Sequence, residues 1–241
     1  MEPPRVLITG ASRGIGRATM RRLRKDGYQP IGVARQTPDD LEDGEQFRAC
    51  DLADPDATGR LVTELLADGP FYGLVNNAAM SPTTSLEDTS AEDMNQAQAL
   101  NVMAPLLLAQ GLVPGMREQG RGRIVNMSSR AALGKVNRTA YSATKAALIG
   151  MTRTWALELA AAGITVNAVA PGPVDTELFR SSSRADDPRT IALKKAVPVK
   201  RVAEPEELAH VVAFLLDDLS GFITGQTLHV DGGLTISAVG L

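Results

Sequence analysis

The sequence predicts an α/β fold with a doubly wound parallel sheet of about seven strands, in a single domain over residues 1–241. Three observations predict it. Short apolar runs alternate with longer segments of helical spacing along almost the whole chain. Several of these runs are apolar at every position, as is typical of strands covered by helices on both faces. The composition is 44% hydrophobic, and we find no linker and no repeat of fixed period. A strand-helix-strand order implies right-handed crossovers and therefore a parallel sheet.

The individual elements follow from this alternation. The predicted strands are residues 6–9, 29–34, 47–50, 73–77, 123–127, 164–169 and 227–230. The predicted helices are residues 15–26, 55–68, 91–119, 141–162 and 205–216. Gly27 and Gly163 follow two of these helices, where a left-handed cap favours glycine.

Residues 176–200 do not fit the alternation. They contain the run Ser181-Ser182-Ser183 and only a short helical stretch near residues 190–196. A loop this long in a compact domain is usually functional or mobile. We therefore expect a substrate lid, whose first apolar side chains are Leu178 and Phe179. The alternative is a disordered surface excursion.

Composition excludes several classes of function. The 25 Lys and Arg residues nearly balance the 28 Asp and Glu residues, for a net charge of −3. No basic stripe of a nucleic-acid-binding protein is present. The single Cys50 cannot form an intrachain disulfide, and with two histidines no metal site is expected. No signal peptide and no run of about 18 apolar residues is visible. We expect a cytoplasmic protein without a membrane or nucleic-acid partner.

A glycine-rich turn lies directly between the first strand and the first helix, with the sequence Thr9-Gly10-Ala11-Ser12-Arg13-Gly14-Ile15-Gly16. Glycines allow a tight turn and close backbone approach, and the helix N-terminus offers free N–H groups to a pyrophosphate. Glycines alone are weak evidence, but this placement makes the signal strong. The turn predicts a Rossmann-type dinucleotide site. Its predicted cofactor-binding residues are Gly10, Ser12, Arg13, Gly14, Ile15 and Gly16.

Four further motifs follow in order: Asn76-Asn77-Ala78 after the fourth strand, Ser128 after the fifth, Tyr141-Ser142-Ala143-Thr144-Lys145 at the start of a helix, and Pro171-Gly172-Pro173-Val174-Asp175-Thr176 after the sixth strand. With the Gly-x3-Gly-x-Gly turn, they closely resemble the short-chain dehydrogenase/reductase family, over essentially the whole chain. Residues 163–171 and 222–233 are most similar to 3-oxoacyl-[acyl-carrier-protein] reductases. One departure is Ala79, where the family commonly has Gly. The resemblance implies a homo-oligomer, commonly a tetramer.

Tyr141 and Lys145 are four residues apart and therefore share one helix face. A free tyrosine has a pKa near about 10, and a neighbouring Lys cation is expected to lower it toward the working pH. Tyr141 is then the acid that protonates a carbonyl oxygen, while Ser128 donates a hydrogen bond to the same oxygen.

Asn101 lies within a long helical segment among apolar neighbours, where Asn is unfavourable without a hydrogen-bonding task. By resemblance it is the fourth catalytic residue, which holds a water that links Lys145 to solvent. The alternative is a buried amide that is satisfied by its neighbours.

The cofactor is predicted to be NADP(H). An NAD site usually has an acid at the end of the second strand, but here Val33-Ala34-Arg35-Gln36 contains none. Arg13 and Arg35 could hold a 2′-phosphate, for which the guanidinium fork is suited. The alternative is that both are ordinary solvated arginines. By resemblance, Asp51 contacts the adenine with Leu52 packed nearby, Asn77 and Ala78 line the adenine ribose, and Thr176 lies at the nicotinamide carboxamide. The other predicted cofactor-binding residues are Pro171, Gly172 and Val174.

The sequence therefore predicts an NADP(H)-dependent enzyme that interconverts a ketone and a secondary alcohol. A 3-oxoacyl chain on an acyl carrier protein would favour basic residues at the mouth, and the candidates are Arg130, Arg138, Arg180 and Arg184. A free small ketone, sugar or steroid needs none of them. The rival is a non-catalytic NADP-binding regulator or scaffold on the same fold. A basic cluster on the first helix, formed by Arg17, Arg21, Arg22, Arg24 and Lys25, is interpreted as a solvated face.

Overall fold

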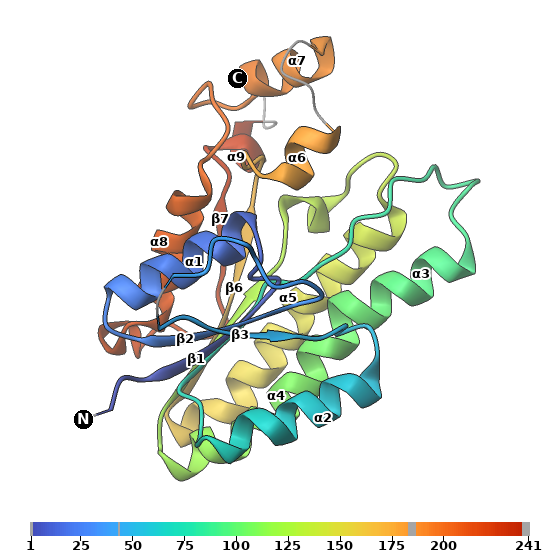
Figure 1. Cartoon of the computed structure of the whole chain (residues 1–241). Coiled ribbons are helices and arrows are strands. Elements are labelled where there is room, and N and C mark those ends of the chain that lie inside the picture. Colours follow the sequence, from blue (N-terminus) through green and yellow to red (C-terminus); the bar gives the residue numbers. More distant parts are fainter. Residues whose placement is uncertain (1, 43, 183–186, 238–241) are drawn as a thin grey trace.

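The chain folds around one seven-stranded parallel sheet with the strand order β3-β2-β1-β4-β5-β6-β7 (Figure 1). The computed structural model describes residues 2–42, 44–182 and 187–237. The strands are β1 (Arg5–Thr9), β2 (Gln29–Ala34), β3 (Gln46–Ala49), β4 (Gly73–Asn76), β5 (Gly122–Met127), β6 (Ile164–Pro171) and β7 (Thr227–Val230). All seven predicted strands are confirmed, as are the fold class and the parallel arrangement.

Helices cover both faces of this sheet. The α-helices are α1 (Gly14–Lys25), α2 (Pro55–Ala67), α3 (Ala91–Gln98), α4 (Ala104–Glu118), α5 (Thr139–Leu159), α6 (Glu177–Ser182), α7 (Pro188–Ala196), α8 (Pro205–Leu216) and α9 (Leu234–Ser237). Four shorter helical segments are η1 (Ala99–Met103), η2 (Arg130–Leu133), η3 (Ala160–Ala162) and η4 (Asp218–Ser220).

Two apolar clusters hold the layers together. One contains Leu7, Leu74 and Ile124 from the sheet and packs under α2, α4 and α5. The other contains Ile8 and Val125 and packs under α1 and α8. Side chains alternate between the two faces along a strand, so Leu7 and Ile8 enter different clusters. Both faces are thereby buried, which explains why the strands are apolar runs rather than alternating patterns.

Local signals determine where several helices begin and end. The Asp54 carboxylate accepts hydrogen bonds from the N–H groups of Asp56 and Ala57, and so caps α2. Ser90 and Asp93 form a reciprocal capping box at α3. Gly163 has a φ of 73° after η3, which confirms its predicted left-handed position.

The predicted helix over residues 91–119 is divided by a π-helix. Residues Ala99–Met103 form this π-helical turn between α3 and α4, and Asn101 lies at its centre. Single π-helical turns within α-helices occur often at functional sites. By length and composition alone, Ala91–Glu118 is long and apolar enough to cross a membrane. Its apolar side packs instead in the cluster shared with α2 and α5, as in the core helix of a globular domain.

The solvated-face interpretation of the first helix is wrong for one of its five basic residues. Arg17 is 4% exposed, and its guanidinium pairs with Asp40 at 3.0 Å and with the buried Glu45 at 2.7 Å. Arg21 and Arg24 pair with Glu42 from the same loop. The spacing on α1 could not show this, because the partners come from the β2–β3 connection.

A buried row of polar side chains links the middle of the sheet to α5. Asn76 donates to Asn126 on the neighbouring strand at 2.8 Å. Asn126 donates to Thr152 on α5 at 2.9 Å, and Thr152 donates to the Leu148 carbonyl at 2.7 Å. This hydrogen-bond network fixes the position of α5 on the sheet, because a displaced helix would leave buried polar groups unpaired at a cost in desolvation free energy.

The strand order reverses between β1 and β4, so the connections after these strands diverge and leave a crevice at the carboxyl edge of the sheet. Helices α6 and α7 stand beyond this edge, at the top of Figure 1. The short helix expected near residues 190–196 corresponds to α7, whereas α6 was not predicted. Residues 183–186, including Ser183 and Arg184, lie outside the described residues, as does the side chain of Leu178.

Candidate active site

The glycine-rich turn joins β1 to α1 at this crevice. Gly10 has a φ of 64°, and a Cβ atom there would lie 2.8 Å from the Ala78 Cα atom. A Cβ on Gly16 would lie 2.3 Å from the Gly10 carbonyl oxygen. Both positions therefore require glycine. Arg13 at the N-cap of α1 makes no side-chain cap and no acid lies in the first turn. The first N–H groups of α1 are thus suited to an anion such as a pyrophosphate.

Thr9 and Asn77 hold this turn in place. The Thr9 hydroxyl accepts hydrogen bonds from the backbone N–H groups of Asn77 and Ala78, both at 2.9 Å. The Asn77 amide donates to the carbonyls of Thr9 and Gly10 at 2.9 and 3.1 Å. The side chain of Asn77 therefore contacts the glycine turn itself. The backbone of Asn77 and Ala78 is the part of this segment that could line a ribose.

The two arginines predicted to select the cofactor lie at the same end of the sheet. Arg35 is exposed immediately after β2. The guanidinium of Arg13 pairs with the carboxylate of Glu177 at 3.1 Å, and both side chains are about 60% exposed (62% and 61%). Ion pairs this exposed contribute little free energy, so an incoming phosphate can displace the carboxylate.

The other predicted cofactor residues come from the ends of β3 and β6. Asp51 is exposed and its carboxylate accepts from the Ala53 N–H, while Leu52 is buried. The Thr176 Cγ2 lies 3.2 Å from the position of a Cβ on Gly14, so the segment after β6 touches the glycine turn. Gly172 and Val174 belong to this same segment, and Pro171 ends β6. The chain thus brings the predicted cofactor residues from β1, β4 and β6 to one place.

Ser129, rather than Ser128, lies beside the Tyr141 phenol. The Ser128 side chain is buried and its hydroxyl donates to the Lys145 carbonyl at 2.7 Å. The Ser129 hydroxyl interacts with the Tyr141 phenol and holds down its pKa. The prediction that Ser128 faces the substrate oxygen is therefore corrected by one residue. Ser128 N–H is bonded to the Val169 carbonyl, which fixes this strand end and with it the direction of each hydroxyl.

Lys145 is 2% exposed, and its ammonium donates to the Met127 carbonyl at 2.6 Å. The ammonium nitrogen lies 5.7 Å from the centre of the Tyr141 ring, so the two side chains share one helix face as predicted. Burial lowers the pKa of Lys145 to about 7, because the charged form loses its hydration.

The pKa of Tyr141 is raised from its ordinary value. Burial is the main cause, while the Ser129 hydroxyl and the Arg138 charge act in the opposite direction. The expected lowering by Lys145 is not observed, because the Lys145 ammonium is directed at the Met127 carbonyl and loses its charge more easily when buried.

Asn101 is fully buried and its amide is engaged on both sides. Its oxygen accepts from the Met80 N–H at 2.9 Å, and its nitrogen donates to the Met80 carbonyl and the Thr144 hydroxyl, both at 3.0 Å. The alternative of a satisfied buried amide is therefore correct for the side chain. The side-chain NH2 group does not bind the expected water, because both of its hydrogens already donate to protein oxygens.

Two of the four basic residues considered for the mouth have partners within the chain, whereas Arg184 lies outside the described residues. Arg138 donates to the carbonyls of Ser81 and Pro82 at 2.6 and 3.3 Å, and so ties the start of α5 to the loop after β4. Arg180 forms a bidentate ion pair with the Asp175 carboxylate, at 2.8 and 2.9 Å. These contacts give both residues a structural task and weaken them as evidence for a carrier protein.

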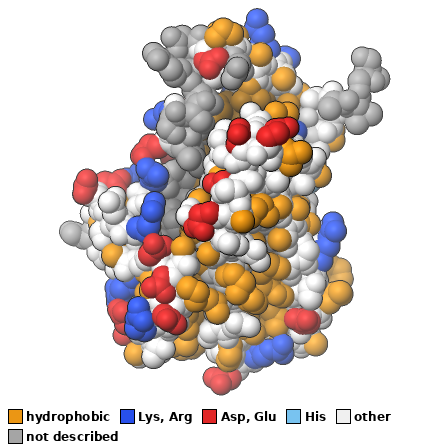
Figure 2. Space-filling view, turned by 90° about the vertical axis from the view of Figure 1, so that its right-hand side faces the viewer, with side chains coloured by type: hydrophobic (Ala, Val, Ile, Leu, Met, Phe, Trp, Pro, Cys, Tyr) orange, Lys and Arg blue, Asp and Glu red, His pale blue; other side chains and the backbone are white. Residues whose placement is uncertain are grey.

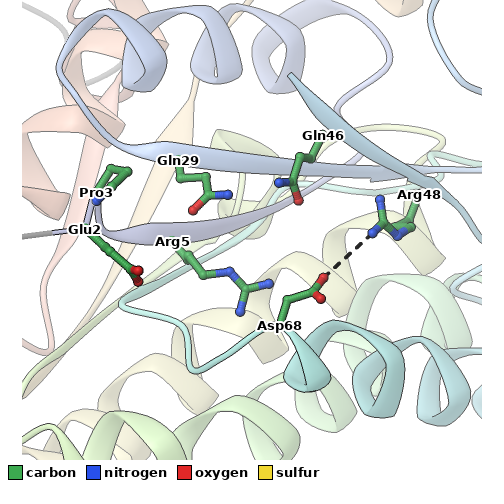
Figure 3. A pocket seen from close by; sticks show the side chains of 7 residues that line it. All are labelled: Glu2, Pro3, Arg5, Gln29, Gln46, Arg48 and Asp68. Carbon is green, nitrogen blue, oxygen red and sulfur yellow. Dashed lines mark ion pairs between the residues drawn. The ribbon is translucent and has the colours of Figure 1, made fainter. Parts of the chain in front are cut away.

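A polar hollow of about 520 Å³ lies at the opposite, amino edge of the sheet (Figure 3). Three of its charged groups have partners within the chain. Arg48 and Asp68 point toward one another at 3.9 Å. Arg5 donates to the Leu65 and Gly69 carbonyls and stacks on Phe71. The side chains that line this hollow make structural contacts between α2 and the strands, and they are remote from Tyr141.

Comparison with known proteins agrees with this geometry. The profile of the family described as enoyl-(acyl carrier protein) reductase matches residues 10–235. The chain is 37% identical to protein FixR of Bradyrhizobium diazoefficiens, over 96% of this chain and 87% of that one. It is 34% identical to the 3-oxoacyl-[acyl-carrier-protein] reductase FabG of Vibrio cholerae, over 95% of this chain and 96% of that one.

Solved structures agree as well. One is a short-chain dehydrogenase/reductase family protein that is 35% identical, with a TM-score of 0.86 over 97% of this chain and 99% of that one. The chain belongs to the short-chain dehydrogenase/reductase family. A second structure is described as an NAD(P)-dependent gluconate 5-dehydrogenase of Beutenbergia cavernae with bound NADP at low occupancy. It is 32% identical with a TM-score of 0.90, over 97% of each chain. The protein is thus an oxidoreductase of this family, which acts on CH–OH and C=O groups with a nicotinamide cofactor.

Within this family site, sequence reasoning missed Thr9, Ser129 and Thr144. Thr9 and Ser129 are each next to a residue that the motifs singled out, Gly10 and Ser128. Thr144 lies inside the Tyr141–Lys145 motif. Each of these hydroxyls stands within or next to a motif, but nothing in the sequence tells which of two adjacent hydroxyls faces the site.

Proposed function

We propose that this protein is an NADP(H)-dependent reductase or dehydrogenase that interconverts a ketone and a secondary alcohol. The observation that carries the proposal is the grouping of the Tyr141 phenol, the Ser129 hydroxyl and the buried Lys145 at the carboxyl edge of the sheet, beside the glycine turn. The presence of both Tyr141 and Lys145 argues against a non-catalytic regulator on the same fold.

Each side chain has a separate task in this proposal. Tyr141 donates its phenolic proton to the carbonyl oxygen in reduction and takes it back in oxidation. Ser129 donates a hydrogen bond to the same oxygen and stabilises the charge that develops on it. Lys145 binds the nicotinamide ribose and replenishes the proton, and Asn101 orders the segment through which that proton reaches solvent. A bound nicotinamide supplies or accepts the hydride.

The preference for NADP(H) rests on Arg13 and Arg35. Both lie at the end of the sheet where β2 meets the glycine turn, and no acid stands directly after β2. A 2′-phosphate brings more charge to Arg13 than the Glu177 carboxylate with which Arg13 pairs. The similar structure with bound NADP supports the same choice.

A panel of ketones, acetoacetyl thioesters and secondary alcohols, each assayed with NADPH or NADP and with NADH or NAD, tests the reaction and the cofactor together. We expect turnover on at least one carbonyl class, with a clear preference for the phosphorylated cofactor. Arg13→Ala is expected to reduce that preference by about tenfold, whereas Arg60→Ala, on the exposed side of α2, leaves it unchanged. Equal turnover with both cofactors, or a preference for NADH, would contradict the NADP(H) assignment.

The thioester arm of this panel addresses the acyl carrier protein. Similarity to 3-oxoacyl-[acyl-carrier-protein] reductases makes a 3-oxoacyl thioester one candidate substrate. Arg138 and Arg180 already bond to groups of the same chain, so they do not favour a thioester substrate over a free ketone, sugar or steroid. The protein is proposed to work in the cytoplasm.

The protein is also proposed to form a homotetramer. Leu219 and Phe222, in the turn before the edge strand β7, are almost fully exposed at 96% and 104%. Figure 2, which views the molecule from the side of α3, shows further apolar side chains gathered over much of its lower half. Apolar patches and an unpaired strand edge are typical of surfaces that a second copy covers.

Light scattering is expected to give a mass of about four chains, because two separate faces are available for pairing. Phe222→Asp should lower this mass, since a charge in the middle of an apolar interface is costly to bury. Leu86→Asp is the matched control, because Leu86 is also an exposed apolar residue, at 75%, but lies in the loop after β4. A monomeric mass for the unmodified protein contradicts the proposal.

A further inference from the structure

Thr144 is buried between the tyrosine and the lysine of the site. It is 4% exposed, and lies three residues after Tyr141 and one before Lys145 on α5. Residues three apart on a helix are neighbours on its surface. Thr144 therefore faces the same side as Tyr141, yet its hydroxyl bonds to the Tyr141 carbonyl and the Asn101 amide rather than to the phenol or the ammonium.

The Thr144 hydroxyl instead makes two hydrogen bonds to the frame of the site. It donates its hydrogen to the Tyr141 carbonyl at 2.9 Å and accepts one from the Asn101 amide at 3.0 Å. Asn101 in turn holds the Met80 main chain from both sides. A continuous series of bonds therefore runs from the loop after β4, through the π-helical turn, to the first turns of α5.

The series fixes the relative position of two elements that are distant in the sequence. Asn101 lies in η1 and Tyr141 on α5, and the two are joined through one side chain. Removing that hydroxyl would leave one hydrogen of the Asn101 amide without an acceptor in the interior. An unpaired buried donor costs free energy, so the surrounding residues would shift to give it another partner. The first turns of α5, which carry Tyr141 and Lys145, would be free to move with it.

We propose that Thr144 is a positioning residue, which fixes the Tyr141–Lys145 turn against Asn101 and so sets the place of the phenol. The proposal rests on the proposed function, because a fixed phenol matters only if it transfers a proton. Misplacement of a reacting group by about 1 Å can cost on the order of a hundredfold in rate. Thr144 acts through Tyr141 and does not itself touch the substrate.

The variants Thr144→Val and Thr144→Ser separate the hydroxyl from the shape of the side chain. Thr152→Val is the matched control. Thr152 lies on the same helix, is fully buried, accepts from the Asn126 amide and donates to the Leu148 carbonyl, but lies two turns farther from the site. Both Val variants remove a threonine hydroxyl between a buried amide and a helix carbonyl, so both should lower the melting temperature by a similar amount.

With the substrate found by the panel, Thr144→Val is expected to lower kcat by about tenfold or more. The KM values and the NADPH affinity should stay within about twofold, because the Thr144 hydroxyl is buried and bonded to Asn101 and the Tyr141 main chain. Thr144→Ser should restore most of kcat, and Thr152→Val should leave kcat and its pH profile unchanged. An unchanged kcat and pH profile in Thr144→Val, or an equal loss in Thr152→Val, would overturn the proposal.

A second measurement needs no turnover and therefore separates this proposal from the proposed function. The chain has only three tyrosines, so ionisation of Tyr141 can be followed by ultraviolet difference absorbance of the ligand-free protein, with Tyr141→Phe to identify its share. The charged or polar groups that bear on this phenol are Ser129, Arg138 and Lys145. In Thr144→Val we expect the pKa of Tyr141 to move down toward its ordinary value, since a less firmly held phenol is better hydrated. Thr152→Val should show no such change. An inactive protein in which this shift occurs contradicts the proposed function alone, and an active protein without it contradicts the role of Thr144.

Discussion

Tyr141→Phe is expected to lose nearly all turnover while keeping the affinity of the protein for NADPH. The variant lacks the proton that the carbonyl oxygen must receive, and general acid catalysis of this kind contributes about a hundredfold to ten-thousandfold to a rate. The phenyl ring preserves the shape of the half-buried side chain, so the fold and the cofactor site should be unaffected. Steady-state kinetics with the best substrate and fluorescence titration with NADPH measure the two quantities.

Tyr28→Phe provides the control for this substitution. Tyr28 lies beside Tyr72 at the amino edge of the sheet, far from the crevice, with the two rings tilted and their centres 6.1 Å apart. Its replacement should leave turnover unchanged. Turnover of Tyr141→Phe within about tenfold of the unmodified protein would show that another group supplies the proton.

The pH dependence follows from the same phenol. Burial holds the pKa of Tyr141 above its ordinary value, so the group is protonated at neutral pH. Ketone reduction consumes the protonated form and should fall as the pH rises through this pKa, whereas alcohol oxidation needs the phenolate and should rise. Tyr141→Phe should abolish both limbs.

Ser129→Ala is expected to lower kcat/KM by about a hundredfold to a thousandfold, the usual loss when one donor to a developing oxyanion is removed. Ser129 interacts with the phenol and is the hydroxyl next to the reacting oxygen in the proposed mechanism. The adjacent Ser128→Ala is the matched control. It removes a buried bond to the Lys145 carbonyl, so it should lower the free energy of unfolding by about 1 kcal/mol and change kcat/KM much less.

Kinetics and thermal unfolding of the two serine variants show which hydroxyl lies beside the substrate oxygen, that of Ser128, as the sequence predicts, or that of Ser129, as the structure indicates. If Ser128→Ala loses activity and Ser129→Ala does not, the hydroxyl beside the substrate is the one that the sequence analysis assigned. The structure predicts the reverse order of effects, with the larger loss of stability in Ser128→Ala.

Much of the fold could be predicted because its signals are local. Apolar runs of strand length, helical spacing between them, and Gly163 after a helix each depend on only a few neighbouring residues. The π-helical turn at Ala99–Met103 could not be predicted in this way, because the amide of Asn101 is satisfied by Met80 and Thr144 from other elements. The burial of Arg17 was missed for the same reason, since its partners Asp40 and Glu45 come from a loop.

The sequence alone determined the family, the parallel sheet, the glycine turn between β1 and α1, and the Tyr141–Lys145 pair. These follow from spacing within single elements and from motifs that occur in a given order. Only the tertiary structure decided which serine faces Tyr141. Strand β5 is buried on both faces, so no apolar–polar alternation marks which face either hydroxyl takes. The bond from Ser128 to the Val169 carbonyl and the packing of α5 settle it, because they direct Ser128 to the Lys145 main chain and leave Ser129 beside the phenol.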